Sequence, residues 1–444
     1  METLIASSLI DLLDLTATAD PWKSALGYLI KHQKIDLYKM ESLIAPLKAS
    51  TPSQEELLTA ASFLSLNEKL KYELKGDIIA HCDGIDETMR ALILTLLGHS
   101  SHVDLKQCKA APETLLQFGL IALFENSQEK KRTFLKMVGE MNLLLDRNGN
   151  PFFSLMTDEK HFCLATLLTV FYLLFFLAGH FSSQKEFEQI ANHLHHRLGL
   201  LEGFYLDAIP SHLLILSLLI EMHDEFEKSS FTVPFAKGLY RDRAIFHQQL
   251  AKIDFSLQFA GKGKSFGAIN KGNIEIVAMG PQQLPLGVME NFGIYREAAN
   301  GAGEFADLIH EEEQLSGWLK LCSYGTTLPE PGNEWLHVDL KTKSDYLTLT
   351  FKPRVQRSDL YFAFFVKAKE AKVEGRPALK PRSLDRIRGK NQEIFFKDAD
   401  EFLYLRTPDL VEIEVIPLAG GNHFFSANFL VAFPIQKSLT LEIS

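Results

Sequence analysis

Residues 261–281, GKGKSFGAINKGNIEIVAMGP, decide the fold of the second half of the chain. Their glycines and lysines are typical of a loop that cradles a phosphate, but such a loop needs the spacing G-x-x-x-x-G-K-[ST] and a helix directly after it. Neither feature is present, because the stretch continues through NKGN at residues 270–273 into the alternating run IEIVAM. The stretch therefore predicts a β-hairpin with its turn at residues 270–273 and glycines that permit bends in its strands.

Short β-rich runs continue from this hairpin to the end of the chain. Runs such as WLHVDLKT, YLTLTFKP and VEIEVIPL are separated by Gly, Pro, Asn and Asp. Before the hairpin, apolar residues recur at helical spacing, and caps such as Asp20 before Pro21, and Thr51 or Ser53, mark the starts of helices. We therefore expect an α+β multidomain chain, with an α/α toroid-like helical domain over residues 1–252 and an antiparallel β-sandwich over residues 253–444.

The composition is that of a folded globular protein with an acidic total charge. Hydrophobic residues make up 46% of the 444 residues, charged residues make up 23%, and the net charge is −10. Because a general nucleic-acid binder needs a basic surface, we expect no nucleic-acid partner, although a local basic patch is compatible with this total. The four cysteines lack C-x-x-C spacing and the N-terminus lacks the basic start of a signal peptide, so we expect a cytoplasmic protein. Non-classical export stays open.

Residues 162–179, FCLATLLTVFYLLFFLAG, contain no charged residue and are just long enough to span a bilayer. His161 and His180 flank them, without the basic cluster that often borders a membrane span. A large helical domain also needs a few helices that are apolar on every side. We expect a buried core helix here, with membrane association as the alternative.

The densest cluster of polar and ionisable side chains lies at residues 192–212, NHLHHRLGLLEGFYLDAIPSH. On a helix, His193, His196 and Arg197 share one face because they stand three and four positions apart. A zinc site needs convergent ligands, as in H-E-x-x-H, and the sequence shows no second cluster that could supply them. We therefore expect no metal and no other cofactor. The alternative to a functional site is a solvated helix end.

Residues 200–221, LLEGFYLDAIPSHLLILSLLIE, resemble a segment of the heparinase-type (heparinase II/III-like) polysaccharide lyases. In that family an Asp-Gly-Gly-His-x-Glu-x-Ser-Pro-x-Tyr-His run precedes a long apolar helix, an α/α toroid is joined to a β-sandwich, and acidic polysaccharides are cleaved in the cleft between them. Gly203 and Pro210 match that run. Tyr205 stands at the place of its functional His, and His212 stands at its Tyr.

The resemblance implies β-elimination from a uronate-containing polysaccharide, with residues of this cluster at the site. The reaction removes a proton beside a carboxylate, so a site must neutralise that carboxylate, supply a base and protonate the leaving oxygen. The catalytic candidates are Tyr205, His212 and Asp207, and the substrate-binding candidates are His196, Arg197 and Glu202. His196 and Arg197 would pair with the carboxylate, while Tyr205 and His212 would move protons.

A second polar cluster, LYRDRAIFHQ at residues 239–248, lies just before the expected domain boundary. Ligands often bind in clefts between domains, so Tyr240, Arg241 and Arg243 are further candidates for substrate binding. The alternative is the solvated polar face of an amphipathic helix over residues 240–252.

Residues 367–390, KAKEAKVEGRPALKPRSLDRIRGK, form a basic segment in the expected β-domain. Between residues 352 and 390 there are 12 Lys or Arg against 4 Asp or Glu. Arg forks in such a segment can hold an anionic glycan or a phosphate-rich partner. Because no aromatic residues are interleaved with the charges, a solvated loop tip is the alternative.

The stretch DRNGNP at residues 146–151 resembles the start of a calcium loop. It lacks the Gly at the sixth position and the Glu at the twelfth that such a loop needs. We therefore expect an interhelical turn there.

Two functions follow from the sequence. The first is a heparinase- or alginate-lyase-like protein that binds an acidic polysaccharide and either cleaves it by β-elimination or has lost that activity through its altered motif. The second is a non-enzymatic interaction module that binds a protein partner through the helical domain and the basic loop of the β-domain.

Overall fold

The computed structural model describes residues 9, 12–13, 15, 18–32, 34–48, 51–100, 103, 112–152, 164–201, 206–223, 228, 231–235, 238–240, 245–259, 265–283, 308–311, 313–323, 330–356, 358–418 and 427–444. The chain forms two compact units. The first comprises Met1–Met141 and Cys163–Phe235, and the second comprises Asn142–Phe162 and Ala236–Ser444. The chain therefore passes through the second unit before it completes the first.

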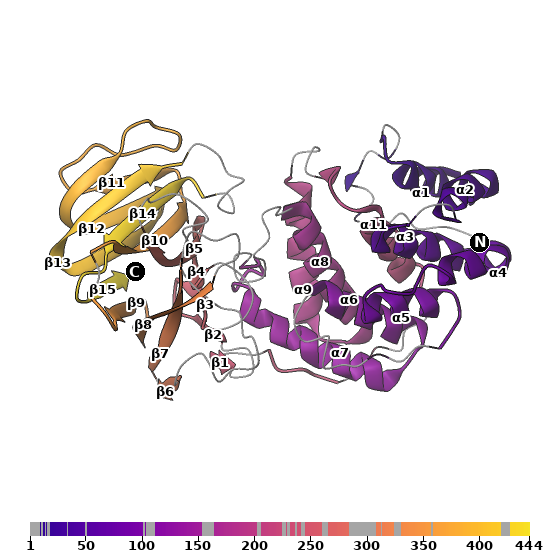
Figure 1. The fold of residues 1–444 in the computed structure, drawn as a ribbon, viewed down its shortest axis with the longest axis horizontal. Helices are drawn as coiled ribbons and strands as arrows, with labels where there is room; N and C mark the ends of the chain where they lie inside the picture. Colours follow the sequence, from indigo (N-terminus) through magenta and orange to yellow (C-terminus); the bar gives the residue numbers. More distant parts are fainter. Residues whose placement is uncertain are drawn as a thin grey trace. The chain divides into compact units, whose positions relative to one another are not determined.

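Ten α-helices make up the first unit in the described part of the chain (Figure 1). They are α1 (Pro21–His32), α2 (Leu37–Ile44), α3 (Gln54–Ser65), α4 (Glu68–Ile79), α5 (Glu87–Leu96), α6 (Pro112–Phe124), α7 (Gln128–Met141), α8 (Leu164–Phe181), α9 (Lys185–Gly199) and α11 (Ser211–Glu221), with a 3-10 turn η2 (Ala45–Lys48) after α2. The helical character predicted for the first half of the chain is confirmed through α11. Its toroid-like arrangement stays a prediction.

Polar caps explain where two of these helices begin. The Oδ1 atom of Asp20 accepts a hydrogen bond from the backbone N–H of Trp22 at 2.8 Å, at the start of α1. The Ser53 hydroxyl accepts from the Glu56 N–H at 3.2 Å, and the Glu56 carboxylate accepts from the Ser53 N–H at 2.8 Å. This reciprocal pair is a capping box, so Ser53 rather than Thr51 caps α3.

The helix expected from the uncharged residues 162–179 is α8. It is apolar on every side, and its buried side chains include Phe171, Phe175 and Leu177. Among the described helices, α8 alone has the length and composition that could cross a membrane, and 72% of it is buried in the structure. The core helix of a soluble protein has the same properties, and we keep that interpretation as our prediction.

Three helices meet at Gly119 in the middle of α6. A Cβ atom on Gly119 would stand 2.4 Å from Cε2 of Phe134 on α7 and 2.8 Å from Cδ2 of Leu177 on α8. Both neighbouring side chains are fully buried, so neither has room to move away. The close approach of α6 to α7 and α8 therefore requires a glycine at this position.

We expect Gly119→Ala to lower the free energy of unfolding by about 1–3 kcal/mol, because the added methyl overpacks this crossing. The matched control is Gly76→Ala in α4, where an added Cβ meets nothing within 4 Å. Alanine is the better helix former by about 1 kcal/mol, so the control should be neutral or stabilising. Urea unfolding of the three proteins measures both effects, and equal shifts in the two variants would contradict the packing argument.

Fifteen strands of the described chain form one antiparallel sheet in the second unit. They are β1 (Gly238–Tyr240), β2 (Ile245–Gln249), β3 (Asp254–Gln258), β4 (Gly267–Lys271), β5 (Ile274–Gln283), β6 (Ile309–Glu311), β7 (Gln314–Ser323), β8 (Glu330–Thr342), β9 (Leu347–Pro353), β10 (Leu360–Lys367), β11 (Glu370–Val373), β12 (Ile387–Asp398), β13 (Glu401–Pro417), β14 (Phe429–Pro434) and β15 (Leu439–Ile443). The spatial order is β1-β2-β3-β4-β5-β10-β14-β13-β15-β9-β8-β7-β6, and β11 is added through β12, which pairs with β13.

The two ends of this sheet nearly meet, so the unit resembles a nearly closed barrel rather than a sandwich. The ring of Phe246 on β2 lies 5.4 Å from the ring of His310 on β6, although these strands stand near opposite ends of the sheet order. A Cβ atom on Gly317 of β7 would stand 3.3 Å from the ring of Phe259, which follows β3. The antiparallel β-structure predicted from the sequence is confirmed, and the predicted division into two sheets is corrected. Strand patterns do not reveal which strands pair.

The hairpin predicted at residues 270–273 is present, whereas Ile245–Gln249, within the helix expected over residues 240–252, form a strand. Lys271 of β4 pairs with Ile274 of β5, and Gly272 between them has a φ of 55°. A positive φ at the first position of a two-residue turn suits glycine. In place of the expected helix, β2 contains Phe246 and His247, which are both buried. A short apolar run cannot distinguish a strand from a helix by periodicity alone.

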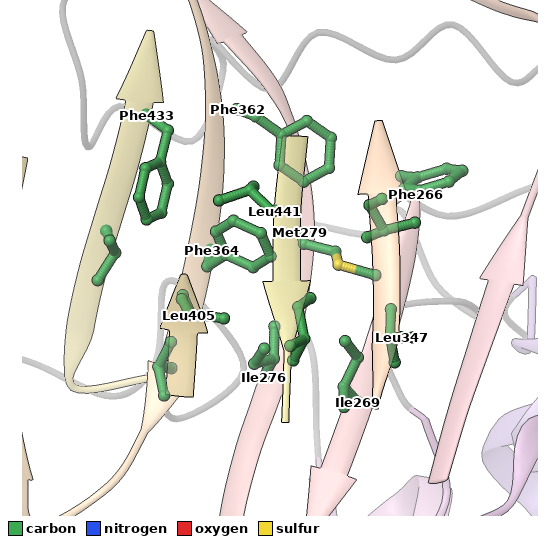
Figure 2. Close-up of a cluster of buried hydrophobic side chains, with 14 of the residues drawn as sticks. Phe266, Ile269, Ile276, Met279, Leu347, Phe362, Phe364, Leu405, Phe433 and Leu441 are labelled. Atoms are coloured by element: carbon green, nitrogen blue, oxygen red, sulfur yellow. The ribbon is translucent and has the colours of Figure 1, made fainter. Parts of the chain in front are cut away.

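One apolar core serves strands from all parts of the sheet (Figure 2). The rings of Phe351 on β9 and Phe362 on β10 stack with their centroids 3.9 Å apart. Phe266 contacts Phe362 edge-on at 6.2 Å, and Phe364 contacts Phe433 edge-on at 5.9 Å. Because these rings come from strands that do not all pair with one another, burial of the rings holds the sheet in its curved form.

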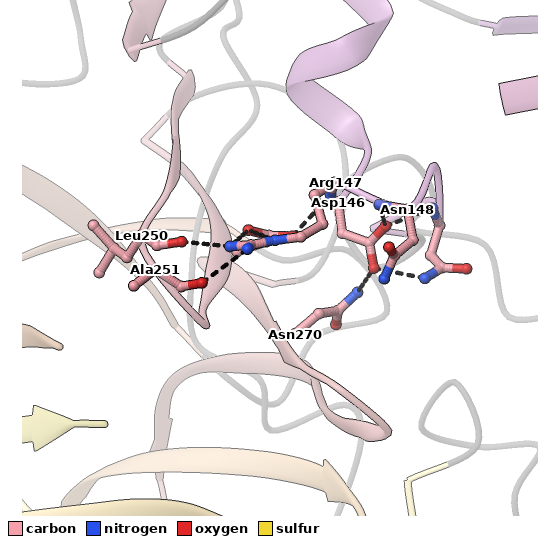
Figure 3. Close-up of polar contacts among 8 residues, drawn as sticks. Asp146, Arg147, Asn148, Leu250, Ala251 and Asn270 are labelled. Atoms are coloured by element: carbon pink, nitrogen blue, oxygen red, sulfur yellow. Dashed lines mark hydrogen bonds and ion pairs between the residues drawn. The ribbon is translucent and has the colours of Figure 1, made fainter. Parts of the chain in front are cut away.

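A segment between α7 and α8 in the sequence belongs to the second unit. It begins with a 3-10 turn, η4 (Asn142–Leu144), and continues through a β-bridge between Leu145 and Pro151. The Asp146 carboxylate accepts hydrogen bonds from the N–H groups of Asn148 and Asn150, both at 2.8 Å, and from the Asn270 amide of β4 at 3.0 Å (Figure 3). The turn predicted at residues 146–151 is therefore confirmed, and it lies against β4.

Arg147 fastens this turn to β3 (Figure 3). Its side chain donates to the Asp254 carboxylate through Nη2 at 2.6 Å and through Nε at 2.9 Å, and its backbone N–H donates to the same carboxylate at 2.8 Å. The guanidinium also donates to the carbonyl oxygens of Leu250 and Ala251. The Asp254 side chain is only 5% exposed, and the bonds to it raise the pKa of Arg147. The carboxylate of this pair is therefore buried, the Arg147 side chain is 38% exposed, and several hydrogen bonds join the two.

We expect Arg147→Ala to lower the free energy of unfolding by about 3 kcal/mol, because it leaves the buried Asp254 carboxylate without its cation. The matched control is Arg388→Ala, which removes an exposed arginine that pairs with Glu412 at 2.7 Å on the surface of β12 and β13. Exposed ion pairs contribute little, so its melting temperature should stay near that of the unchanged protein. A melting temperature of Arg147→Ala equal to that of the control would rule out the proposed role.

Candidate functional site

Part of the predicted polysaccharide site lies outside the described residues. Tyr205, Glu202, Arg241 and Arg243 belong to this part. Tyr240 ends β1 in the second unit, and its side chain is not described. The roles assigned to these residues stay predictions.

His196 and Arg197 lie in the last turn of α9. The His196 side chain is exposed, and Arg197 is partly buried. The neighbouring His195 ring packs 5.6 Å from the Tyr172 ring of α8. In the part of the chain that the structure describes, no group of three His, Cys, Asp or Glu side chains is placed to hold a metal ion.

Asp207 and Ser211 anchor the segment that leads into α11. The Asp207 side chain is exposed, while its carbonyl oxygen accepts a hydrogen bond from the ammonium of Lys23, a residue that is only 5% exposed. The Ser211 hydroxyl donates to Asp20 at 2.6 Å. Burial lowers the pKa of Lys23, and the nearby Asp20 and Asp207 oppose that shift. These contacts to α1 fix the N-terminal end of α11, where His212 is the second residue.

His212 lines a cavity of about 70 Å³ inside the helical unit. The walls come from the first two turns of α3, α5, α6, α8 and α11. The lining residues are Glu55, Leu58, Met89, Glu113, Leu116, Gln117, Thr166, Pro210, His212, Leu213 and Leu216. Of the described members of the predicted polysaccharide site, His212 alone borders this cavity. The N-terminal, electropositive turns of five helices thus border one small space.

Burial lowers the pKa of His212 to about 4, so its imidazole is neutral at pH 7. The helix N-terminus acts in the same direction, because it disfavours a positive charge. A neutral imidazole offers one N–H donor and one acceptor. No described residue forms a hydrogen bond with either ring nitrogen, so both are available to a molecule in the cavity.

Because the pKa of His212 is lowered in the folded chain, we expect the stability of the protein to fall as the pH falls. The unfolded chain binds a proton at His212 near pH 6.5, whereas the folded chain binds it only near pH 4. The stabilisation that depends on a neutral His212 is therefore complete above pH 6.5 and is lost as the pH falls toward 4. This stabilisation of the folded state amounts to roughly 3 kcal/mol.

We expect the ring proton resonances of His212 to stay unchanged from pH 8 to pH 5 in NMR spectra and to move only near pH 4. We also expect His212→Gln to flatten the loss of unfolding free energy between pH 6.5 and 4. A His212 midpoint near 6.5 would show that the imidazole is solvated in the folded protein and would exclude this account.

The polar atoms of the cavity do not form a site for a carboxylate. The lining includes the carboxylates of Glu55 and Glu113 and, among the described residues, no Lys or Arg side chain. Gln117 donates through Nε2 to the Met89 sulfur at 3.7 Å, and its buried Oε1 atom has no hydrogen-bond partner in the described structure. A neutral histidine beside two glutamates cannot neutralise the carboxylate of a uronate.

A second candidate surface lies on β11, β12 and β13 in the other unit. Three aromatic rings are partly exposed there and contact one another, with centroid distances of 5.6 Å from Phe395 to Tyr404, 6.0 Å from Phe395 to Phe402 and 6.3 Å from Phe402 to Tyr404. A cation stands over each ring. Lys372 lies 5.9 Å from the Phe395 centroid, Lys397 lies 5.6 Å from that of Phe402, and Arg406 lies 4.4 Å from that of Tyr404. We name these six residues the aromatic face.

Strand register explains why these six side chains share one face. Lys372 pairs with Phe395, Phe395 pairs with Tyr404, and Lys397 pairs with Phe402 across β11, β12 and β13. Directly opposite residues on antiparallel strands point to the same side of the sheet. Arg406 is paired with Glu393 at 2.5 Å and with Glu442 at 3.5 Å, whereas Lys372 and Lys397 have no ion-pair partner among the described residues. The two lysines therefore carry the uncompensated charge.

The basic segment predicted from the sequence, residues 367–390, contains β11 and the loop that joins it to β12, and it borders this face. Leu379 is 5% exposed and forms a β-bridge with Ala371, so the loop is anchored to the sheet. Besides Lys372, the exposed cations of the segment without an ion-pair partner in the described structure are Arg376, Lys380, Arg382 and Lys390. The segment is thus an ordered extension of the sheet.

Sequence reasoning missed the aromatic face for a specific reason. The basic segment itself contains no aromatic residues, so it resembled a solvated loop. The rings come from the following hairpin, EIFFKDADEFLYLR at residues 393–406. In that hairpin, aromatic and charged residues alternate with buried ones, and this alternation is the signal that could have identified the face.

Comparisons with known proteins place the chain only by a distant likeness of fold. No protein-family model matches the sequence, and no curated protein matches it. A chondroitin AC lyase variant from Streptomyces coelicolor A3 is 9% identical, with a TM-score of 0.34 over 95% of this chain and 73% of that one. A 4-alpha-glucanotransferase from Thermococcus litoralis is 9% identical, with a TM-score of 0.32 over 63% of this chain and 49% of that one, so the match spans about half of that enzyme. The chain is thus distantly similar in structure to a polysaccharide lyase and to a glycoside enzyme.

Proposed function

We propose that the protein binds an acidic polysaccharide on the aromatic face and the basic loop beside it. The observation that carries this proposal is the set of three rings, each with a cation above it, on one side of β11, β12 and β13. An aromatic ring beneath a cation holds it in place without neutralising its charge, so the exposed Lys372 and Lys397 can attract an anion that approaches from solvent.

The chemistry of the surface suits a charged sugar chain better than an acidic protein segment. The C–H groups of a pyranose ring pack against aromatic side chains, and its carboxylates or sulfates pair with Lys and Arg. Lys372, Lys397 and Lys390 provide cations along the exposed strands, while Arg376 and Arg382 in the loop provide forked donors. A repeating anion can engage several of these groups together.

We propose binding without eliminative cleavage. The cleavage predicted from the sequence needs a base whose pKa lies near the working pH, and a His212 with a pKa of about 4 is a weak proton acceptor. It also needs a group that neutralises the uronate, and the cavity around His212 contributes Glu55 and Glu113 instead. Tyr205, the other catalytic candidate, stays a prediction.

The test measures binding to heparin, alginate and polygalacturonate by isothermal titration calorimetry, with dextran as the uncharged control. We expect the acidic polysaccharides to bind and dextran not to bind, with weaker affinity at higher salt because exposed charges are screened. Lys372→Ala and Lys397→Ala should each weaken binding roughly three- to tenfold, and Tyr404→Ala should weaken it by a similar factor.

Lys437→Ala is the matched control, because it removes an exposed lysine of the same unit outside the aromatic face and the basic loop. Its affinity should equal that of the unchanged protein. If Lys437→Ala weakens binding as much as Lys372→Ala does, attraction is nonspecific and the proposed face is wrong. If no acidic polysaccharide binds at low salt, the proposal fails and the protein-binding alternative is favoured.

A further inference from the structure

The cavity around His212 is a second site, and its assignment does not depend on polysaccharide binding at the aromatic face. Three neutral polar groups in its wall have no hydrogen-bond partner among the described residues: the His212 imidazole, the Thr166 hydroxyl and the Gln117 Oε1 atom. Buried polar groups are nearly always hydrogen-bonded, so the buried Gln117 Oε1 atom needs a donor from within the cavity. The partly buried His212 and Thr166 side chains lie in the first turn of their helices and can bond to the same molecule.

The charges around the cavity favour a ligand without net charge. The electropositive ends of α3, α5, α6, α8 and α11 surround it, and they disfavour a cation. The exposed Glu55 and Glu113 stand in the same lining, and their negative charge offsets the attraction of the helix ends for an anion. A neutral group that both donates and accepts hydrogen bonds is subject to neither effect. A hydroxyl is such a group.

The wall also provides an apolar side for a short carbon skeleton. Leu58, Leu116, Leu213 and Leu216 line it together with Met89. Its volume of about 70 Å³ is several times the space that one water molecule needs, and it is smaller than the roughly 150 Å³ of an engineered cavity that holds benzene. The space therefore suits a skeleton of three or four carbon-sized atoms with its hydroxyls turned toward His212 and Thr166.

We propose that this cavity binds the vicinal diol of a small free polyol. One hydroxyl donates to the acceptor nitrogen of His212 or accepts from its N–H, and the other pairs with the Thr166 hydroxyl. The exposed N–H groups at the start of α11, which has no side-chain cap, are further donors to these oxygens.

Four probes of similar size separate the charge types: 1,2-propanediol, propylammonium, propionate and 1-propanol. NMR spectra at pH 7 of the full chain, labelled at the methionine methyls and histidine rings, report on Met89 and His212. We expect saturable shifts of both signals with the diol at a Kd on the order of millimolar, which is typical of a ligand of five heavy atoms. The two ionic probes should give no saturable shift, and 1-propanol should bind at least threefold more weakly than the diol.

Two isosteric variants complete the test. Thr166→Val removes the hydroxyl that lines the cavity, and Thr133→Val removes the hydroxyl of a threonine on α7 outside it. The first should weaken diol binding about five- to tenfold, and the second should leave it unchanged.

Xylose and methyl glucoside test whether the vicinal hydroxyls of a sugar ring can replace those of a small polyol, since a pyranose ring is larger than the skeleton that the cavity fits. Saturable shifts with either sugar at the affinity of the diol would contradict the assignment to a small polyol. Shifts with the diol but with neither sugar assign the cavity to a free polyol. If propylammonium or propionate binds more tightly than the diol, or if the diol gives no saturable shift, the proposal is overturned.

Discussion

The pairing of Arg147 with Asp254 constrains the second unit more than any other single polar contact described above. It holds a turn that lies between two helices in the sequence against β3, and Asp146 holds the same turn against β4. The buried Asp254 carboxylate and the buried Asn270 amide are both satisfied by this turn. A fragment that begins at Ala236 would lack it and would leave two polar side chains unsatisfied in its core. The β-unit therefore cannot be built from the C-terminal half of the sequence alone.

This constraint also explains which parts of the fold the sequence could predict. Short sequence motifs were sufficient to predict features that involve only residues close together in the chain. The caps at Asp20 and Ser53 mark helix starts, and Gly272 marks a hairpin whose strands are neighbours in the chain. The membership of residues 142–152 in the β-unit rests on contacts across more than one hundred positions, as between Arg147 and Asp254. No periodicity encodes such a contact.

The two errors about secondary structure and topology have the same origin. Residues 245–249 became β2 rather than a helix because they pair with β3 and bury Phe246 and His247 in this sheet. Tertiary pairing overrides the local preference of a short segment. The continuous, nearly closed sheet differs from a sandwich only in which strands are neighbours, as where β5 pairs with β10 across about eighty residues. Strand composition is the same in both arrangements.

For the candidate sites, the sequence indicated single residues but not their surroundings. His212 was a candidate because of its place in a motif, whereas its chemistry depends on burial among α3, α5, α6, α8 and α11. The basic segment was visible as a charge pattern, but the rings beside it lie on the strands that follow. A side chain's identity can be read from the sequence, and its pKa and its partners cannot.

The aromatic face and the cavity around His212 differ in charge, and the net charge of −10 does not indicate this difference. On the aromatic face, Glu393 and Glu442 pair with Arg406, while Lys372 and Lys397 have no ion-pair partner among the described residues, and this is the basis for proposing an anionic ligand there. In the helical cavity, helix ends and glutamates oppose one another, and His212 stays neutral. In the described structure, His212 and Thr166 have no protein hydrogen-bond partner, and each bond that is forgone is worth about 1 kcal/mol. This loss is the physical basis for proposing a neutral ligand that restores those bonds.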